Sequence, residues 1–96
     1  MVMDSAVPLK VLLQKFLRES GLERTVREMS VPQYWRDVVG ERIAQVSTVK
    51  YFEQGQLFIE VGAAVWRMEL LARREEIRTA INERCGEETV REIIIR

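Results

Sequence analysis

The stretch GQLFIEVGAAVWRMELL, residues 55–71, decides the fold because its periodicity changes halfway along. Apolar residues occupy every second position from Leu57 to Val61, which is the period of a β-strand with one apolar face. Trp66 and Leu70 follow at helical spacing, after the small residues 62–64. We therefore predict a strand that turns directly into a helix, with Trp66 and Leu70 burying the start of that helix against the sheet.

A second strand precedes this unit. The segments TVKYFEQ and QLFIEVG flank residues 54–55, and glycine in the second position of a two-residue connection is common in β-hairpins. Strict alternation in the first strand places Val49 and Tyr51 on one face and Lys50 and Phe52 on the other. Because a hairpin with one apolar face is not stable alone, we expect helices to cover it.

Helices are expected before the hairpin. Between Pro8 and Gly21 an apolar stripe at helical spacing is formed by Leu9, Leu12, Leu13, Phe16 and Leu17. A short helix follows through residues 26–29, and Pro32 begins another helix with an apolar face formed by Trp35, Val38, Val39, Ile43 and Val46. Gly40 lies inside this last pattern, where glycine costs about 1 kcal/mol relative to alanine. We therefore expect another backbone to approach Gly40 closely, and Trp35 to anchor the core.

Downstream of Trp66 charged residues interrupt the helical stripe. Arg73 falls on the same line as Ile77, so we expect a break in the helix near residues 72–74. Gly86 ends the helix, and TVREIIIR predicts a closing β-branched strand. The predicted fold class is α+β, with N-terminal helices, an antiparallel hairpin, a long or split helix and a final strand. We expect one domain over residues 1–96, a three-stranded sheet covered by helices, and disorder in residues 1–7.

Composition argues against several classes of function. The chain has 96 residues, 15 basic and 15 acidic side chains and no histidine, so Ser–His and Cys–His catalysis and histidine zinc sites are excluded. The lone Cys85 cannot form an intrachain disulfide, and no glycine opens a phosphate loop. We expect no enzyme activity, no cofactor and no metal. The short apolar runs and the N-terminal sequence predict a cytoplasmic protein that does not enter a membrane.

Basic residues gather along the helix that follows the hairpin. Arg67, Arg73, Arg74 and Arg78 fall within twelve residues, and Lys50 lies on the neighbouring hairpin. Arginine suits phosphate because its planar guanidinium donates two hydrogen bonds at once. These five residues predict a weak, salt-sensitive nucleic-acid-binding face. Alternatively, the arginines pair with Glu69, Glu75 and Glu76 and form an ordinary solvated helix face.

An ordered set of residues resembles the DciA-like family of bacterial proteins. The set consists of Trp35, Val39–Gly40, Ile43–Ala44, Ser47, Gly55, Leu57, Val61, Trp66, Glu69–Leu70, Ile77, Asn82 and Gly86. It runs in the family's order through about two thirds of the chain. The resemblance implies a domain similar to the KH type II fold, DNA binding, and a role in bacterial chromosome replication in which the protein assists loading of the replicative helicase.

The chain departs from relatives of this fold in two ways. RNA-binding KH domains clamp the nucleic-acid backbone with a Gly-x-x-Gly loop, whereas the corresponding residues 71–74 are Leu-Ala-Arg-Arg. Longer family members also carry an extension after the KH-like domain. Two alternatives therefore stay open, namely an RNA-binding KH-like adaptor and a protein-interaction module without nucleic-acid binding. The second alternative includes a homodimer formed through the closing strand, if that strand lies at the edge of the sheet.

Overall fold

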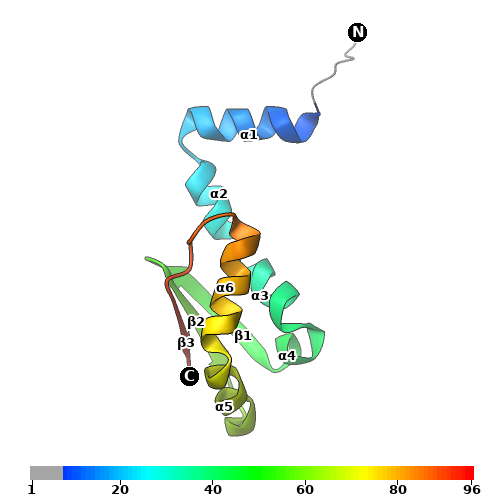
Figure 1. The fold of residues 1–96 in the computed structure, drawn as a ribbon, viewed down its shortest axis with the longest axis vertical. Helices are drawn as coiled ribbons and strands as arrows, with labels where there is room; N and C mark the ends of the chain where they lie inside the picture. The colour runs from blue at the N-terminus through cyan, green and yellow to red at the C-terminus, as the bar shows by residue number, and fades with distance from the viewer. Residues whose placement is uncertain (1–7) are drawn as a thin grey trace.

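The computed structural model describes residues 8–96, which form six helices and a three-stranded sheet (Figure 1). The helices are α1 (Leu9–Ser20), α2 (Glu23–Met29), α3 (Val31–Val39), α4 (Glu41–Gln45), α5 (Ala64–Ala72) and α6 (Arg74–Cys85). The strands are β1 (Ser47–Glu53), β2 (Gln56–Val61) and β3 (Glu92–Ile95). The disorder expected for residues 1–7 falls outside the described residues.

The sheet has the order β1-β2-β3. Strands β1 and β2 are antiparallel, and Gln54 and Gly55 join them with φ angles of 52° and 81°, as a tight two-residue hairpin turn requires. Strand β3 pairs parallel to β2 after the crossover through α5 and α6. This topology confirms the predicted α+β, KH type II-like fold. It also places β3 at an edge of the sheet, which is the condition for a homodimer formed through that strand.

Strand β1 departs from the predicted alternation. Val49 pairs with Ile59 and Tyr51 pairs with Phe58, so Lys50 is an extra residue without a Cα partner in the register. Such a β-bulge exchanges the two faces for every residue that follows it. Val49 and Phe52 accordingly pack against the core, while Tyr51 does not. The prediction that Val49 and Tyr51 share a face was wrong because simple alternation does not allow for the bulge.

The core lies between the sheet and the helices α3, α5 and α6. Its buried residues are Val31, Trp35, Leu57, Ile59, Val61, Leu70, Ile77, Ile81, Val90, Ile93 and Ile95. The indole Nε1 of Trp35 donates a hydrogen bond of 3.0 Å to Ser47 Oγ, which donates in turn to the Ile43 carbonyl. Trp66 is only half-buried at the border of this core, with the Arg42 guanidinium 5.9 Å from its ring centroid. The predicted core role is confirmed for Trp35, whereas Trp66 only borders the core.

The predicted helix through Gly40 is two helices. Helix α3 ends at Val39 and α4 begins at Glu41, with Gly40 between them at φ 90° and ψ 162°. This backbone conformation is accessible almost only to glycine. No heavy atom of residues 8–96 outside its chain neighbours lies within 4 Å of a Cβ built at Gly40. The expected close approach of another backbone was therefore wrong, and glycine is needed here for the turn itself.

The break expected near residues 72–74 is confirmed. Helix α5 ends at Ala72 and α6 begins at Arg74, while Arg73 lies between them with its N–H directed at the Leu70 and Leu71 carbonyls. Gly86 then closes α6 in the left-handed conformation, with φ 85°, as predicted.

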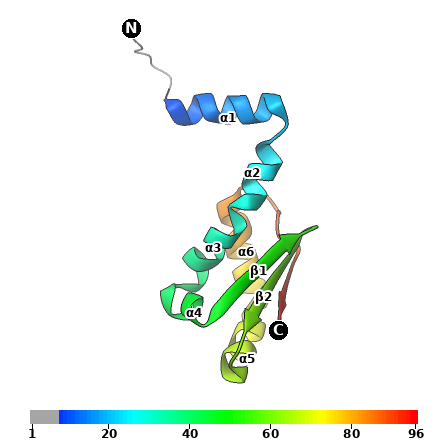
Figure 2. The ribbon, with the colours of Figure 1, turned by 180° about the vertical axis from the view of Figure 1, so that it is seen from behind.

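Helix α1 projects from the rest of the molecule (Figures 1 and 2). It runs across one end of the structure, away from the sheet, and connects to the body through α2. The radius of gyration is 16.4 Å, compared with about 13 Å for a compact domain of this size. The extents of 58 × 26 × 20 Å show the same elongation.

Candidate nucleic-acid interface

The structure separates the five basic residues predicted to contact nucleic acid. Arg67, Arg73, Arg74 and Arg78 lie on α5, on α6 or between these helices, while Lys50 lies in the bulge of β1. The helices cover one face of the sheet (Figure 2). Lys50 belongs to the other face, where it lines a hollow with Phe58 and Ile94 and lies 3.6 Å from Glu60. The predicted residues therefore do not form one continuous patch.

Two of the arginines are held by bonds within the fold. The Arg67 guanidinium donates to the carbonyls of Val61 and Gly62, and so ties α5 to the end of β2. Arg78 lies 3.0 Å from the Glu75 carboxylate and 3.1 Å from that of Glu88, and it donates to the Val90 carbonyl. The hydrogen bond with Glu75, the largest of these influences, raises the pKa of Arg78 above its already high value. These bonds connect α5 to the end of β2, and α6 to the segment before β3.

Arg73 and Arg74 are the exposed members of the group. Arg73 forms an ion pair of 2.9 Å with Glu69, one helical turn before it, and its side chain is 58% exposed. Arg74 has no carboxylate within 4 Å among the residues that the structure describes. Exposed pairs at this spacing contribute only about 0.3–0.5 kcal/mol, so a phosphate can displace Glu69 at low cost.

Two separate hollows next to α6 are rich in carboxylates. One is lined by Arg78, Thr79, Asn82, Glu83, Gly86, Glu87 and Glu88, and the other by Gln54, Gln56, Arg74, Glu75, Arg91 and Glu92. Glutamates outnumber arginines in the first and equal them in the second. A phosphate entering either hollow meets like charges, which raises the cost of binding. Residues 71–74 also lack the glycines with which RNA-binding KH domains approach a nucleic-acid backbone.

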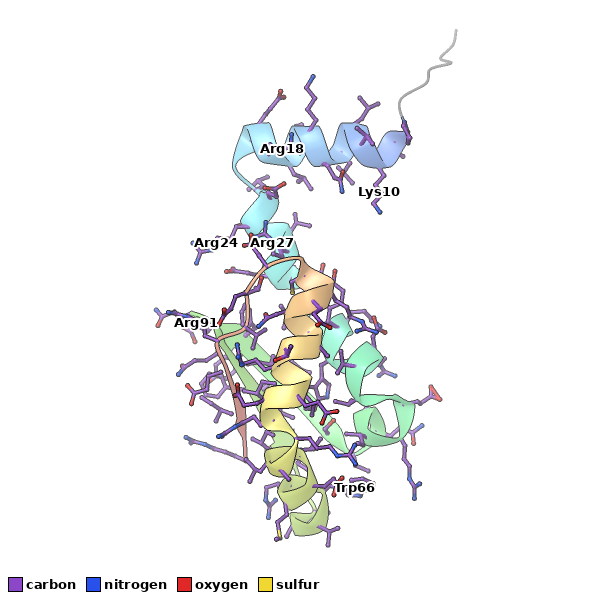
Figure 3. All side chains as sticks on the ribbon, viewed as in Figure 1. Lys10, Arg18, Arg24, Arg27, Trp66 and Arg91 are labelled. Atoms are coloured by element: carbon purple, nitrogen blue, oxygen red, sulfur yellow. The ribbon has the colours of Figure 1, made fainter. Side chains whose placement is uncertain are left out.

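Sequence reasoning missed a cluster of arginines where α2 meets the body (Figure 3). Arg27 pairs with Glu87 at 2.9 Å, Arg24 lies 3.2 Å from Glu28, and Arg91 donates to the Gln54 carbonyl. Two of these contacts join segments that lie far apart in the sequence, which no local pattern reveals. The Arg27 pair therefore holds α2 against the loop before β3, and Arg91 holds that loop against the hairpin turn.

The outer face of the sheet carries a second feature that the sequence did not predict. The rings of Tyr51 and Phe58 stack with centroids 4.3 Å apart and an interplanar angle of 26°. Phe58 also pairs in register with Ile94 on β3. A hollow over this row is lined further by Lys50, Glu60 and Arg96. The signal available in the sequence was the alternation of β2, which places Phe58 opposite the core residues.

Helix α1 presents a third surface. Leu9, Leu12, Leu13 and Phe16 are between 52% and 80% exposed, and none of the residues of α1 is buried. Lys10 and Arg18 lie toward the two ends of this helix (Figure 3). The apolar stripe predicted from the sequence is therefore present, but within residues 8–96 nothing buries it.

Metal binding and membrane insertion find no support in residues 8–96. This part of the chain contains no group of three or more histidine, cysteine, aspartate or glutamate residues able to hold a metal ion. Within it, every helix is too short or too polar to cross a membrane.

The comparisons with known proteins point to one family. The model described as Dna[CI] antecedent, DciA, matches residues 8–95. No curated protein matches the chain. The matched family is associated with chromosome replication and helicase loading. Since the match covers nearly all of the chain and agrees with the residues that carry the resemblance, this protein belongs to the DciA family.

Proposed function

We propose that this chain is a non-enzymatic, cytoplasmic accessory protein of bacterial chromosome replication that helps to load the replicative helicase. Membership of the DciA family supports the general role. The observation that carries the proposal is the uncovered apolar face of α1. In this proposal α1 contacts the helicase, and exposed basic side chains of the body contact DNA.

The apolar residues of α1 have the spacing of a docking helix. Leu9, Leu12, Leu13 and Phe16 occupy positions i, i+3, i+4 and i+7 of one face. This is the pattern by which an amphipathic helix inserts into an apolar groove of a partner. Exposed apolar faces of this kind mark interaction sites on proteins of this size.

The charges beside this face define the chemistry of the partner. Lys10 and Lys15 border the stripe on opposite sides, and α1 carries three basic residues against the single acidic Glu19. A second copy of α1 would therefore bring like charges together. We assign the face to a helicase subunit that offers an apolar groove with carboxylates along its rim.

A pull-down with purified replicative helicase tests this assignment. The double change Leu12→Ser/Phe16→Ser should abolish capture of the helicase while leaving the thermal melt of the body unchanged, because neither side chain is buried. Val65→Ser/Met68→Ser is the matched control, because it removes two exposed apolar side chains from α5 instead.

The outcomes separate three cases. Equal capture by the parent and Leu12→Ser/Phe16→Ser would place the helicase contact elsewhere. Failure of the parent to bind the helicase at all would reject the loading role. A parent dimer that the α1 variant converts to a monomer, seen by light scattering, would assign the face to a second copy of the chain.

The proposal includes weak DNA binding by Arg67, Arg73, Arg74, Arg78 and Lys50. Support is strongest for Arg73 and Arg74, since both are exposed and neither is bonded to the backbone of the core. Arg67 and Arg78 contribute positive charge nearby but are already bonded within the fold. The RNA-binding KH-like alternative has less support, because residues 71–74 lack the glycines with which RNA-binding KH domains clamp a nucleic-acid backbone.

A protein-interaction module without nucleic-acid binding is the second candidate. The uncovered face of α1 favours it independently of the arginines. Strand β3 also lies at the sheet edge, and dimerisation through it stays a prediction. Titration with labelled DNA distinguishes this candidate from the first, because a pure interaction module leaves the DNA unbound at low salt.

A further inference from the structure

The face of the sheet that points away from the helices is open (Figure 2). In β2 the residues Leu57, Ile59 and Val61 are buried beneath the helices, so Gln56, Phe58 and Glu60 occupy the opposite face. In β3 the same alternation buries Ile93 and Ile95 and places Ile94 on the open side. The helices thus cover the sheet on one side only.

An aromatic row crosses this open face. Tyr51, Phe58 and Ile94 are neighbours in register on the three strands, and the two rings are stacked at 4.3 Å. None of the three belongs to the core, and Tyr51 is 47% exposed. A strand without a bulge would have turned Tyr51 toward the helices. The extra residue Lys50 brings the tyrosine ring next to Phe58, and bulges often aim side chains at functional sites in this way.

The hollow over the row is lined by two cations and one carboxylate, which leaves an excess of one positive charge for an anionic ligand. Lys50 and Arg96 line the hollow from opposite edges of the sheet, on β1 and after β3. Glu60 also lines it, and its carboxylate lies 3.6 Å from Lys50 Nζ. Both side chains of this pair are more than half exposed, so the pair is weak and opens readily to a phosphate.

We infer that this surface, made of Lys50, Tyr51, Phe58, Ile94 and Arg96, binds single-stranded DNA. Bases stack on the Tyr51 and Phe58 rings, while Lys50 and Arg96 hold the phosphates on either side. Aromatic side chains on a sheet with adjacent cations form such platforms because every unpaired base has a stacking face. A duplex hides those faces, so the surface discriminates between single and double strands.

The inference rests on the proposed function, since it names the form of DNA and a site for it. It differs from the proposed contacts at Arg73 and Arg74, because those residues lie at the junction of α5 and α6 and read only phosphate charge. The junction of α5 and α6 therefore binds duplex and single-stranded DNA alike. The sheet face accounts for any preference for single strands.

Fluorescence anisotropy with labelled oligo-dT and with a duplex of equal length tests the site. Tyr51→Thr removes the ring but keeps a good strand former, and it should weaken oligo-dT binding roughly tenfold while leaving duplex binding unchanged. Lys50→Gln should lower the salt dependence of oligo-dT binding by about one phosphate contact. Met68→Thr is the matched control, since it alters an exposed side chain on α5.

Each outcome is decisive. Unchanged oligo-dT binding by Tyr51→Thr, with DNA binding by the parent intact, overturns the sheet site and leaves the proposed function standing. Absence of any DNA binding by the parent overturns both. Should Tyr51→Thr fail to fold, NMR titration of the parent with oligo-dT decides. Shifts of the Tyr51, Phe58 and Ile94 amides support the site, and shifts confined to residues 73–74 reject it.

Discussion

At the scale of the residue, the two tryptophans provide the first prediction. Trp35 is buried and bonded to Ser47, so Trp35→Ala should lower the free energy of unfolding by about 3–5 kcal/mol. Trp66 is half-buried under Arg42, and Trp66→Ala should cost less, about 1–2 kcal/mol. Urea unfolding followed by circular dichroism measures both. Equal losses would show that Trp66 is a second core anchor.

Gly40 gives a prediction based on its backbone conformation. Its φ of 90° and ψ of 162° strain any residue with a Cβ, so Gly40→Ala should destabilise the protein by about 1–3 kcal/mol. Gly40→Leu should cost about the same, because the described residues leave open space around this position. Thermal melts of the two variants provide the comparison. A much larger loss for leucine than for alanine would instead indicate overpacking.

Asn82 connects α6 to the segment before β3, so we expect a large loss of stability when its side-chain amide is removed. Its amide donates to the Val90 carbonyl at 2.8 Å and accepts from the N–H groups of Thr89 and Val90. Asn82→Ala leaves these part-buried groups unpaired and should cost about 2–4 kcal/mol. Asn82→Asp keeps the two accepted bonds and should lose less, as unfolding midpoints in urea will measure. Indistinguishable midpoints for the parent and Asn82→Ala would reject this role.

Single-residue expectations from the sequence succeeded where local chemistry decides the outcome. Gly86 closes α6 and Gly55 completes the hairpin turn, because both positions need a positive φ that glycine adopts freely. Gly40 was recognised as unusual but explained wrongly, since periodicity alone does not distinguish a helix interior from a junction of two helices. The pair of Arg27 with Glu87 joins distant segments, and the bonds of Asn82 reach across the turn after α6, so neither follows from helix or strand periodicity.

At the scale of the element, the junction of α5 and α6 carries the prediction on DNA. Arg73→Gln/Arg74→Gln should lower DNA affinity and reduce the slope of log affinity against log salt by roughly 0.7–0.9 for each phosphate that is no longer neutralised. The thermal midpoint should change little, because Arg73 contributes one exposed pair and no buried contact. Anisotropy titrations at several salt concentrations, together with a melt, test both statements.

A charge-matched variant controls this experiment. Lys10→Gln/Lys15→Gln removes the same charge from α1, far from the junction in the structure. Affinity and salt slope should stay close to those of the parent in this variant. If the α1 variant loses binding while the junction variant keeps it, the DNA contacts belong to the basic residues of α1 instead.

Most elements were predictable because each carries its own period and its own end signal. The hairpin follows from the alternation of its strands, and the closing strand follows from its β-branched run. The break after Ala72 follows from Arg73, a charged residue on the apolar stripe. The bulge in β1 was not predictable, because its evidence is the pairing with β2 and not the composition of β1. The candidate site was affected most, since the bulge turns Tyr51 onto the open face of the sheet, where it stacks on Phe58 near Lys50.

At the scale of the whole molecule, α1 behaves as an appendage. A chain that starts at Leu22 should melt within a few degrees of the parent, because no residue of α1 belongs to the core. The same truncation should abolish helicase capture. The truncated chain should have a radius of gyration of roughly 11–12 Å by small-angle X-ray scattering, the value for a compact domain of its length. The structure of the parent has 16.4 Å. A large loss of stability would show that α1 folds back onto the body in solution.

The sequence could not show that the apolar face of α1 is left uncovered. An amphipathic stripe indicates that something buries it, but the same stripe serves a core and a partner equally well. The equal numbers of acidic and basic residues likewise did not indicate which surface could bind DNA. Only the placement of the elements showed which apolar face is left open and which arginines are already bonded.

The parallel pairing of β3 with β2 has a consequence for biosynthesis. Ile93 and Ile95 complete the core beside Leu57 and Ile59, which leave the ribosome well before them. Until β3 emerges, the hairpin and α5 have no finished interior, and the nascent chain exposes the edge of β2 that β3 later covers. Folding is therefore completed only after residues 92–95 have cleared the exit tunnel, and a ribosome stalled before them holds a chain open to chaperones and proteases.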